Sequence, residues 1–379
     1  MTERLAVVSF TPDLATITPF EVDFSGKEIA QYPSAEFSKD DYRSLRRHLR
    51  WLFYPLRYDV IFTLPSTEAV TVYERSVSLR ENPRAAIDEG EIDNFISDTL
   101  WRLYERTKPR AIRALNISDA DLLFRDASVF HLSVDEVPWG SEKEMKGRQM
   151  DLELSVTFAS RDSNHRMESL LPDRASVVFF AESGSVATRY LSQFHSRPFL
   201  FGAIDRQMVY LFLRTKDRIA HYDSFAWGWE KLEEVFAAAY NISPAVASSL
   251  FGILAQEEAS PHVLRHFRLN AKKETRELLM GLTHARDRAN ASTVCLASGI
   301  LSGLVKLPKM ITFVPDGDII PSSFRLEKKS GSFFPFIWPR ECVRENFFPL
   351  ASLSEYLSIF DNRPLQHLAR RRVRWLLAQ

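Results

Sequence analysis

Short apolar runs separated by polar turns dominate the middle of the chain. Three of these runs, at residues 198–203, 208–214 and 219–225, have the length and composition of β-strands. After them comes Gly228 between two tryptophans, and then an amphipathic pattern at residues 229–240 that predicts a helix. Strands joined by tight turns and followed by a helix form a recurring supersecondary unit, and the stretch predicts one.

The same patterns predict strands and helices on both sides of this stretch. Apolar runs and period-2 alternation indicate strands at residues 4–10, 15–24, 59–64, 70–79, 121–132 (a strand pair), 150–158 and 174–182. Helical periodicity or a helix-starting residue indicates helices from Ser38 to about residue 53, and at 88–104, 183–194, 245–258, 261–284 and 364–379. Residues 292–308 predict a strand, a turn and a helix. This alternation is typical of α/β proteins.

Length and composition bound the class of protein. A chain of 379 residues suggests two or more domains, and 45% apolar with 26% charged residues is ordinary for globular proteins. The 49 basic and 49 acidic residues cancel, so no overall charge favours nucleic acid. Two cysteines exclude a disulfide scaffold, and no apolar run reaches the ~18–20 residues of a membrane span. The N-terminus is unlike a signal peptide, so we expect a cytoplasmic protein.

Glycine is scarce, and this bears on nucleotide binding. The chain has 13 glycines, with no two adjacent and no Gly-x-Gly. Loops that cradle phosphate use glycine because the backbone must approach the anion closely and adopt positive φ. A chain this poor in glycine is therefore ill equipped to hold a nucleotide in the usual way.

One part of the first half resembles a known insert. Its motifs are Val-Ile-Phe-Thr-Leu-Pro at residues 60–65, Arg80 and Pro83 before a helix, Val-Phe-His-Leu-Ser-Val at 129–134, and Gly-Arg-Gln-Met-Asp-Leu-Glu-Leu at 147–154. In order and spacing they resemble the SHS2-type insert of FtsA-like and PilM-like proteins, the bacterial actin homologues of cell division and of type IV pilus assembly. In those families the insert serves protein–protein contact.

The resemblance implies an α/β, actin-like ATPase (ribonuclease-H-like) fold, with two related α/β halves and an inserted SHS2-like α+β subdomain. It also implies five parts of the chain. These are 1–83, the first part of half I; 84–160, the insert; 161–196, the rest of half I; 197–345, half II with a reduced helical subdomain; and 346–379, the C-terminal helices.

The resemblance also locates three turns that would contact a nucleotide. In the family the first two carry Asp-x-Gly patterns, and the third usually carries a Gly-Gly pair. Here the first turn, residues 9–14, has no glycine and contains Pro12, which lacks an N–H donor. The second reads Gly-Ala-Ile-Asp-Arg-Gln at residues 202–207, and the third keeps only Gly299 and Gly303. The degenerate cleft positions are therefore Asp13, Gly202, Asp205, Gln207, Gly228 and Gly299.

With all three turns altered together, we expect no bound cofactor, no catalytic residue and no metal site. Ordinary hairpin and αβ turns explain the same residues. Asp205 stands where the family has a phosphate-loop or magnesium-linked carboxylate, and its neighbour Arg206 could neutralise it and fill the anion site. The alternative is a weak ATPase that still binds ATP and magnesium, as the resemblance implies. The pair His262 and His266 lacks the rest of a zinc-binding HExxH motif.

The last helix combines apolar and basic residues. Arginine, tryptophan and leucine on one short helix are typical of an interfacial membrane anchor, and FtsA-like proteins end in such a helix. The candidates for membrane contact are Leu368, Arg370, Arg371, Arg374, Trp375 and Leu376. A final helix packed on the body, with its arginines in solvent, explains the pattern equally well.

These observations predict a non-catalytic, FtsA-like scaffold of bacterial cell division that links partner proteins to one another and to the membrane. The alternatives are a PilM-like component of type IV pilus assembly and the weak ATPase. The expected partners are proteins of the division or pilus machinery, further copies of the chain and a membrane surface at the C-terminal helix, with no nucleic acid. The expected location is the cytoplasm, peripheral at the inner face of the plasma membrane.

Overall fold

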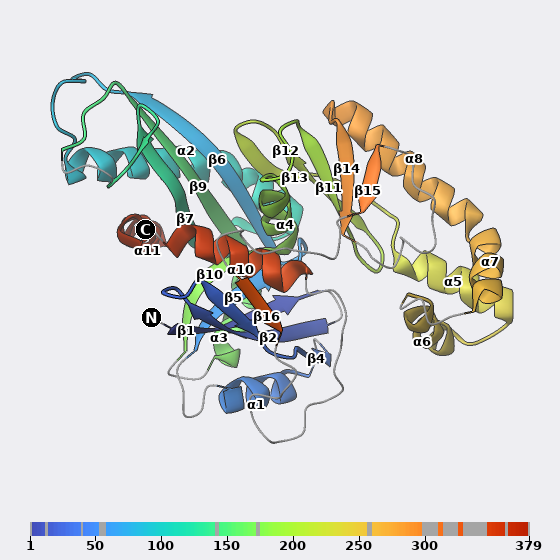
Figure 1. The fold of residues 1–379 in the computed structure, drawn as a ribbon. Helices are drawn as coiled ribbons and strands as arrows, with labels where there is room; N and C mark the ends of the chain where they lie inside the picture. The colour runs from blue at the N-terminus through green and yellow to red at the C-terminus, as the bar shows by residue number, and fades with distance from the viewer. Residues whose placement is uncertain are drawn as a thin grey trace. The chain divides into compact units, whose positions relative to one another are not determined.

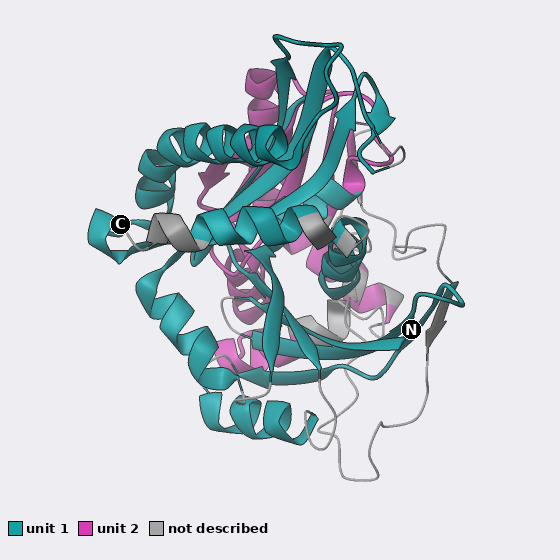
Figure 2. Ribbon diagram, turned by 90° about the vertical axis from the view of Figure 1, so that its left-hand side faces the viewer, with its two compact units in different colours: residues 1–190, 217–220, 319–379 teal, residues 191–216, 221–318 magenta. Residues whose placement is uncertain are grey.

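The structure is a computed structural model that describes residues 2–11, 14–38, 41–52, 58–140, 144–171, 175–255, 260–297, 310–313, 325–328, 347–360 and 363–377 (Figure 1). Contacts divide the chain into two compact units (Figure 2). Unit 1 comprises residues 1–190, 217–220 and 319–379, and unit 2 comprises residues 191–216 and 221–318. These contacts do not separate residues 84–160 from unit 1, so the five-part division stays a prediction.

The first sheet of unit 1 has the strand order β3–β2–β1–β5–β10. Its strands are β1 (Thr2–Phe10), β2 (Leu14–Asp23), β3 (Glu28–Gln31), β5 (Asp59–Leu64) and β10 (Ser176–Glu182). β1 pairs antiparallel with β2 and parallel with β5, and β5 pairs parallel with β10. Two more strands extend this sheet: β4 (Ala35–Ser38) pairs with β2, and β16 (Arg325–Lys328) pairs with β3.

Helices α1 (Tyr42–Leu52) and α3 (Arg161–Leu170) pack on this sheet. α1 is helical because leucines recur at three- and four-residue spacing, and Leu45, Leu49 and Leu52 are all buried. They share one core with side chains of α3, β1, β5 and β10. Helix α10 (Phe347–Phe360) contacts β1 and β5, and α4 (Ser183–Leu191) follows directly after β10.

The second sheet of unit 1 has the order β6–β9–β7–β8. Its strands are β6 (Ala69–Leu79), β7 (Leu122–Val134), β8 (Val137–Pro138) and β9 (Gln149–Ser160), and all their pairings are antiparallel. Helix α2 (Glu89–Leu115) contacts β6 and β9, and the carboxylate of Asp88 caps its N-terminus. A single 3-10 turn, η1 (Asp119–Asp121), precedes β7.

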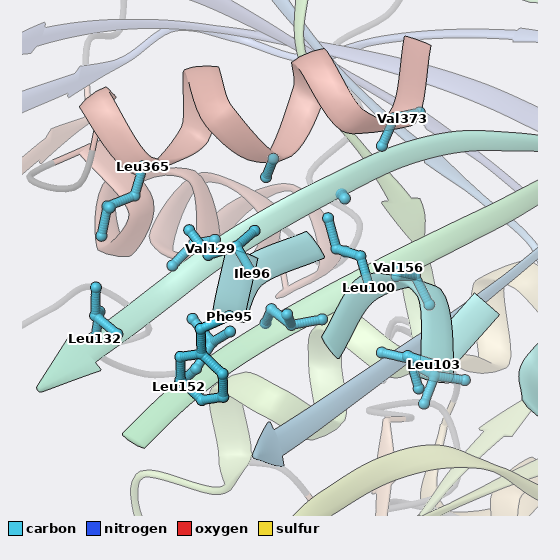
Figure 3. Close-up of a cluster of buried hydrophobic side chains, with 14 of the residues drawn as sticks. Phe95, Ile96, Leu100, Leu103, Val129, Leu132, Leu152, Val156, Leu365 and Val373 are labelled. Carbon is cyan, nitrogen blue, oxygen red and sulfur yellow. The ribbon is translucent and has the colours of Figure 1, made fainter. Parts of the chain in front are cut away.

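The last helix, α11 (Arg363–Leu377), packs on this second sheet. Leu365, Ala369 and Val373 are buried in one cluster with apolar side chains of α2, β6, β7 and β9. Figure 3 shows Leu365 and Val373 directed from the helix toward the strands. Because the three buried residues are four positions apart, they form one stripe of the helix.

Gln366 of α11 closes the outer edge of β7. The main-chain N–H of Val129 donates to Gln366 Oε1 at 3.0 Å, and the Gln366 amide donates to the Val129 carbonyl oxygen. β7 has a bulge at this point, between Val129 and His131. One side chain thus supplies the two bonds that a neighbouring strand would supply.

Unit 2 repeats the strand order of the first sheet. Its strands are β11 (Phe199–Ile204), β12 (Val209–Arg214), β13 (Arg218–Phe225), β14 (Thr293–Ala297) and β15 (Ile311–Phe313), in the order β13–β12–β11–β14–β15. β11 is antiparallel to β12 and parallel to β14, and β14 is parallel to β15. The first residues of β13 belong to unit 1, where Ile219 pairs with Tyr73 of β6.

Four helices accompany this sheet: α5 (Trp229–Tyr240), α6 (Pro244–Ala255), α7 (Pro261–Asn270) and α8 (Lys272–Ala289). Their buried residues, such as Phe236 and Leu282, form one core with Leu211 and Leu296 of the strands. The helix predicted at residues 261–284 is two helices, α7 and α8, which meet at Ala271.

One strand order therefore occurs twice. In unit 1, β2 is antiparallel to β1, β5 is parallel to β1, and β10 is parallel to β5. In unit 2, β12 is antiparallel to β11, β14 is parallel to β11, and β15 is parallel to β14. This is the ribonuclease-H-like order, and its duplication defines the actin-like fold. The predicted fold class is confirmed: α/β, with two related halves built on mixed sheets.

Two elements of the second sheet differ from the sequence prediction. Of residues 121–132, which were predicted to form a strand pair, Asp121 ends η1 and 122–132 belong to one strand, β7, because register shifts at Phe124/Asp126 and Val129/His131 interrupt the period-2 pattern. Helix α2 continues past residue 104, because Thr107, Ala111 and Leu115 prolong its buried stripe.

We expect Gln366→Ala to lower the free energy of unfolding of unit 1 by about 2 kcal/mol, because it leaves the N–H and C=O of Val129 without their partner. Urea unfolding measures this change. The next residue, His367, is exposed, and His367→Ala should change the free energy of unfolding by less than about 0.5 kcal/mol. Equal effects of the two substitutions would contradict the role assigned to Gln366.

Candidate functional site

The first predicted nucleotide turn joins β1 and β2. The N–H of Thr11 donates to the Leu14 carbonyl at 2.8 Å, and the N–H of Leu14 donates to Thr11 Oγ1 at 3.1 Å. These bonds close a hairpin over Pro12 and Asp13, which both lie outside the described residues. The groups that flank the turn are therefore used internally.

The second predicted turn joins β11 and β12 and lies against the N-terminus of α5. The N–H of Asp205 donates to the Met208 carbonyl at 2.8 Å, which closes the turn. The N–H of Trp229 donates to the Asp205 carbonyl at 3.1 Å, and that of Glu230 to the Arg206 carbonyl at 2.9 Å. Unpaired N–H groups at a helix N-terminus are what an anion binds. Here carbonyls of the turn accept two of them.

The side chains of this turn are engaged with α5 as well. The Gln207 amide donates to one oxygen of Glu230 at 2.9 Å, and the Arg206 guanidinium lies 3.7 Å from the other. Asp205 Oδ1 accepts the N–H of Arg206 at 2.5 Å. The indole N–H of Trp229 donates to the carbonyl that precedes Asp205 in the chain, at 3.2 Å. The turn and the start of α5 thus form one hydrogen-bonded unit.

Two of the predicted cleft glycines are required by close packing within the protein. At Gly228 a β-carbon would lie 2.1 Å from the Arg206 carbonyl oxygen and 2.4 Å from the Gln207 nitrogen. At Gly202 a β-carbon would lie 2.6 Å from Leu296 Cδ2. Gly202 lies within β11, where the Leu296 side chain fills the space that a side chain at this position would need.

Of the six predicted cleft residues, the structure therefore places Asp205 and Gln207 in this turn and Gly228 against it, while Gly202 lies within β11. It does not place the other two, because Asp13 and Gly299 lie outside the described residues. No described contact assigns a ligand to any of the four.

A polar cluster lies at the carboxyl ends of the parallel strands β1, β5 and β10. In open α/β sheets, ligands bind at this edge. Ser9, Thr63 and Glu182 stand there, with exposed fractions of 6%, 0% and 0%. The Thr63 hydroxyl donates to the Ser9 hydroxyl at 2.9 Å. These polar groups are buried and bonded to other protein groups.

Glu182 joins the two sheets of unit 1. Its N–H donates to Thr71 Oγ1 at 2.8 Å, and its carboxyl oxygen accepts the N–H of Thr71 at 3.2 Å. Thr71 Oγ1 in turn lies 2.9 Å from Thr157 Oγ1 of β9, and the Ser185 hydroxyl lies 2.7 Å from the Glu182 carboxyl. Burial raises the pKa of Glu182 to about 7, against hydrogen bonds from Ser66, Ser185 and Thr71 that lower it.

A second buried carboxyl belongs to Glu355 of α10. Burial raises its pKa to about 7, while the positive charge of Arg189, 3.9 Å away, lowers it. Arg189 also lies 3.2 Å from the carboxylate of Glu153, and its guanidinium is 5.1 Å from the ring centroid of Phe130. These contacts tie α4, α10 and the second sheet together.

Two of the three arginines of α11 that were predicted to contact a membrane, Arg370 and Arg371, have protein partners. Arg370 Nε lies 3.3 Å from Asp126 Oδ1, and the same guanidinium donates to the Val178 carbonyl. Arg371 lies 3.1 Å from the carboxylate of Asp93 on α2.

The apolar side of α11 is engaged too. Leu368 is partly buried against the core of the second sheet. The side chains of Arg374, Trp375 and Leu376 lie outside the described residues. The described part of α11 packs on the body, as one of the two interpretations of the sequence requires, and membrane contact stays a prediction.

Comparison with known proteins gives matches in structure but not in sequence. No protein-family model matches the chain, and no curated protein matches it. A PilM–PilN type IV pilus biogenesis complex aligns with a TM-score of 0.49 and 13% identity, over 97% of this chain and 98% of that one. A Bacteroides thetaiotaomicron protein of actin-like ATPase fold and unknown function aligns with 0.36 and 8%, over 82% and 91%. The ethanolamine utilization protein EutJ of Carboxydothermus hydrogenoformans aligns with 0.37 and 10%, over 82% and 84%.

The chain has the actin-like ATPase fold. The evidence for this fold is the strand order that occurs in both units. Similarity to solved structures at such low identities says nothing beyond the fold. Within the described residues, no helix is both long enough and apolar enough to cross a bilayer.

The sequence analysis missed the two buried carboxyls, although each had a signal. Glu182 is the one charged residue at the end of an apolar strand and directly precedes a helix. Glu355 is the one charged residue of an otherwise apolar helix, α10. A single acid in an apolar element has to be neutralised or paired.

We expect Gly228→Ala to lower the free energy of unfolding of unit 2 by about 3 kcal/mol, because its β-carbon would overlap main-chain atoms that cannot rotate away. Urea unfolding followed by tryptophan fluorescence measures it. Gly90→Ala is the control: its β-carbon would lie 3.2 Å from a side-chain oxygen of Asp88, so the change should stay within about 0.5 kcal/mol. If Gly228→Ala is as stable as the control, the turn does not lie against α5.

The raised pKa of Glu182 predicts how stability depends on pH. The folded protein keeps this carboxyl protonated up to pH about 7, whereas the unfolded chain releases the proton near the ordinary value of 4.5. The free energy of unfolding therefore falls as pH rises through this window, by about 3 kcal/mol for this group, and levels off above it.

Glu182→Gln, which keeps the shape and removes the acid, should reduce this slope and make the protein more stable than wild type at pH 8. Urea unfolding at pH 5, 6, 7 and 8 compares the two. Parallel profiles of variant and wild type would show that Glu182 is not the titrating group.

Proposed function

We propose that this protein is a non-catalytic scaffold of actin-like fold, which binds partner proteins and does not hydrolyse a nucleotide. One observation carries the proposal: two amide groups at the start of α5, those of Trp229 and Glu230, bond the carbonyls of Asp205 and Arg206. The turn at which a phosphate would be expected is filled by the protein's own main chain.

Phosphate binding at this turn would first require those bonds to break. Each main-chain hydrogen bond is worth about 1 kcal/mol net, and an anion can gain nothing until the donors are released. Arg206 and Gln207 would have to leave Glu230 as well. A phosphate loop in the ordinary sense is pre-organised with its donors open, and this turn has the opposite arrangement.

Gly202 supports the proposal independently of the turn. A side chain at position 202 would have to enter a space that is occupied by Leu296. A buried carboxylate among apolar side chains is unfavourable by several kcal/mol unless it is paired. The core beside β11 therefore has no place for a carboxylate at this position.

The carboxyl edge of the first sheet supports the same conclusion. Its polar side chains, Ser9, Thr63 and Glu182, are nearly or fully buried and bond other protein groups. A ligand at this edge would have to replace bonds that hold the two sheets of unit 1 together.

Two cellular processes are considered for the scaffold: cell division and type IV pilus assembly. We carry the pilus setting forward as the first to test, because the PilM–PilN complex aligns over nearly the whole of both chains. In this proposal the partners are proteins of the pilus machinery, as PilN is for PilM in that complex. Cell division stays a prediction of the sequence resemblance.

Three further parts of the proposal also come from the sequence resemblance. Residues 84–160 act as the inserted subdomain for protein contact, and copies of the chain associate with one another. The protein works in the cytoplasm, beside the inner face of the plasma membrane. A peripheral membrane contact would use the end of α11, residues 374–376, since the arginines at 370 and 371 bind carboxylates of the protein.

The proposal predicts that ATP with magnesium does not raise the melting temperature of the protein. A ligand at one hundred times its dissociation constant stabilises the native state by about 2.7 kcal/mol, which shifts the melting temperature by several degrees. Differential scanning fluorimetry with 5 mM ATP and magnesium measures it, with an actin-like ATPase of known affinity as the positive control. A shift of several degrees would favour the weak ATPase instead.

A further inference from the structure

The second sheet of unit 1 has two outer strands, and their edges differ. The outer edge of β7 is covered by β8 at one end and by Gln366 of α11 at Val129. On the other side, β13 pairs with β6 only at Tyr73 and Glu74. One further bond runs from the N–H of Arg75 to the Asp217 carbonyl, at 2.9 Å. Among the described residues, no strand pairs with the outer edge of β6 beyond Arg75.

The alternation of the strand shows which main-chain groups face this open edge. Arg75 donates outward, to Asp217, and Arg80 donates inward, to the Arg148 carbonyl at 2.8 Å. Since successive residues point in opposite directions, the N–H and C=O of Val77 and Leu79 point outward. They have the spacing with which an added strand forms hydrogen bonds.

A groove with a volume of about 730 Å³ runs beside this edge. This volume lies within the range of about 300–1,000 Å³ that is typical of ligand pockets. Leu79 and Met150 line it on the side of the sheet, and Phe95, Asp98 and Trp101 line it on the side of α2. A strand added to β6 at the usual distance of about 4.8 Å would direct every second side chain into this groove.

Arg80 holds one end of the groove in a fixed shape. Its side chain is 2% exposed and bonds both carboxylate oxygens of Glu91, at 2.6 and 2.8 Å. It also donates to the carbonyls of Ala85 and Gly147, at 3.2 and 3.0 Å. The groove is thus pre-formed, which lowers the entropic cost of binding.

The lining combines exposed apolar surface with negative charge. Of the lining residues, Trp101 is 45% exposed and Leu79 65%; Val77, on the open edge of β6 but outside the groove, is 51% exposed. The charged residues that line the groove are two arginines, Arg80 and Arg102, and four acids, Glu81, Asp88, Glu91 and Asp98. Two positive against four negative charges leave an excess of two negative charges.

We propose that the outer edge of β6 binds an extended, basic peptide segment of a partner protein, which adds a strand to the sheet. Main-chain bonds to Val77 and Leu79 would hold the segment in register. An apolar side chain would contact Trp101, and a lysine or arginine would meet Asp98. The inference rests on the proposed scaffold function and names the chemistry of one partner.

Charge distinguishes this occupant from a second copy of the chain. Two copies that paired through β6 would bring two acidic grooves together, and like charges repel in such a contact. A basic peptide relieves the excess negative charge of the groove. Binding should therefore weaken as the salt concentration rises.

The test uses the full chain and a phage-displayed library of random 12-residue peptides. Enriched peptides are synthesised and measured by fluorescence anisotropy. We expect them to carry lysine or arginine two positions from an apolar residue, without proline between. Hydrogen exchange of residues 74–80 should become slower when such a peptide is bound.

Two substitutions test the two parts of the proposal, the main-chain hydrogen bonds to β6 and the negative charge of the groove. Val77→Pro removes an outward N–H and leaves the ladder with β9 in place, because the N–H of Val77 does not point to β9. Asp98→Lys reverses a charge on an exposed helix surface. Each should weaken binding more than tenfold. Glu234→Lys, the same charge change on an exposed residue of unit 2, should weaken it less than twofold.

Three outcomes would overturn the proposal. One is the absence of enrichment over a surface without protein. Another is enriched peptides that bind Val77→Pro and Asp98→Lys as tightly as wild type. The third is a wild-type dimer in sedimentation velocity that Val77→Pro dissociates, because β6 would then bind a second copy. None of these results depends on whether ATP binds, so this inference and the proposed function fail separately.

Discussion

The bond between Glu182 and Thr71 is the contact on which the arrangement of unit 1 depends. It joins the last strand of the first sheet to the first strand of the second, through main-chain and side-chain groups at once. Burial raises the pKa of the Glu182 carboxyl to about 7, so below neutral pH it acts mainly as a neutral hydrogen-bonding group. The second sheet, with α2 and α11 packed on it, is held in place at this junction together with Arg189 and Glu355.

The same principle applies at the turn of unit 2, where hydrogen-bonding groups of the protein are paired with one another. In phosphate-binding loops glycine lets the anion approach the backbone closely, and Gly228 has a different neighbour. The backbone that approaches it is the turn at Arg206 and Gln207. A scaffold benefits from such closure, because a rigid body presents its binding edges without first having to be ordered by a nucleotide.

From the sequence, the fold could be predicted more fully than the contacts between residues. Strand–turn–strand patterns and the helix at residues 229–240 follow from local periodicity and indicate an α/β protein, whereas the actin-like fold came from the family resemblance. Bulges in β7 could not be seen, since a bulge inserts one residue into a pattern of period two. The sequence also left open whether α11 packs on the body or contacts a membrane. Its basic residues look alike whether they face lipid or carboxylates, and Asp93 and Asp126 are far from them in the chain. At the candidate site, altered motifs were visible, but the closure by α5 was not, because main-chain bonds leave no mark on residue type.

The contact between Gln366 and Val129 joins residues 237 positions apart in the chain. Between them lies the whole of unit 2, so unit 1 is interrupted in sequence by another folded body. Contacts of such separation slow folding, because a long loop must close before they form. Unit 2 is built almost entirely from one stretch and can fold independently of that closure. The topology therefore lets unit 2 form without the contacts that α11 makes with the second sheet of unit 1.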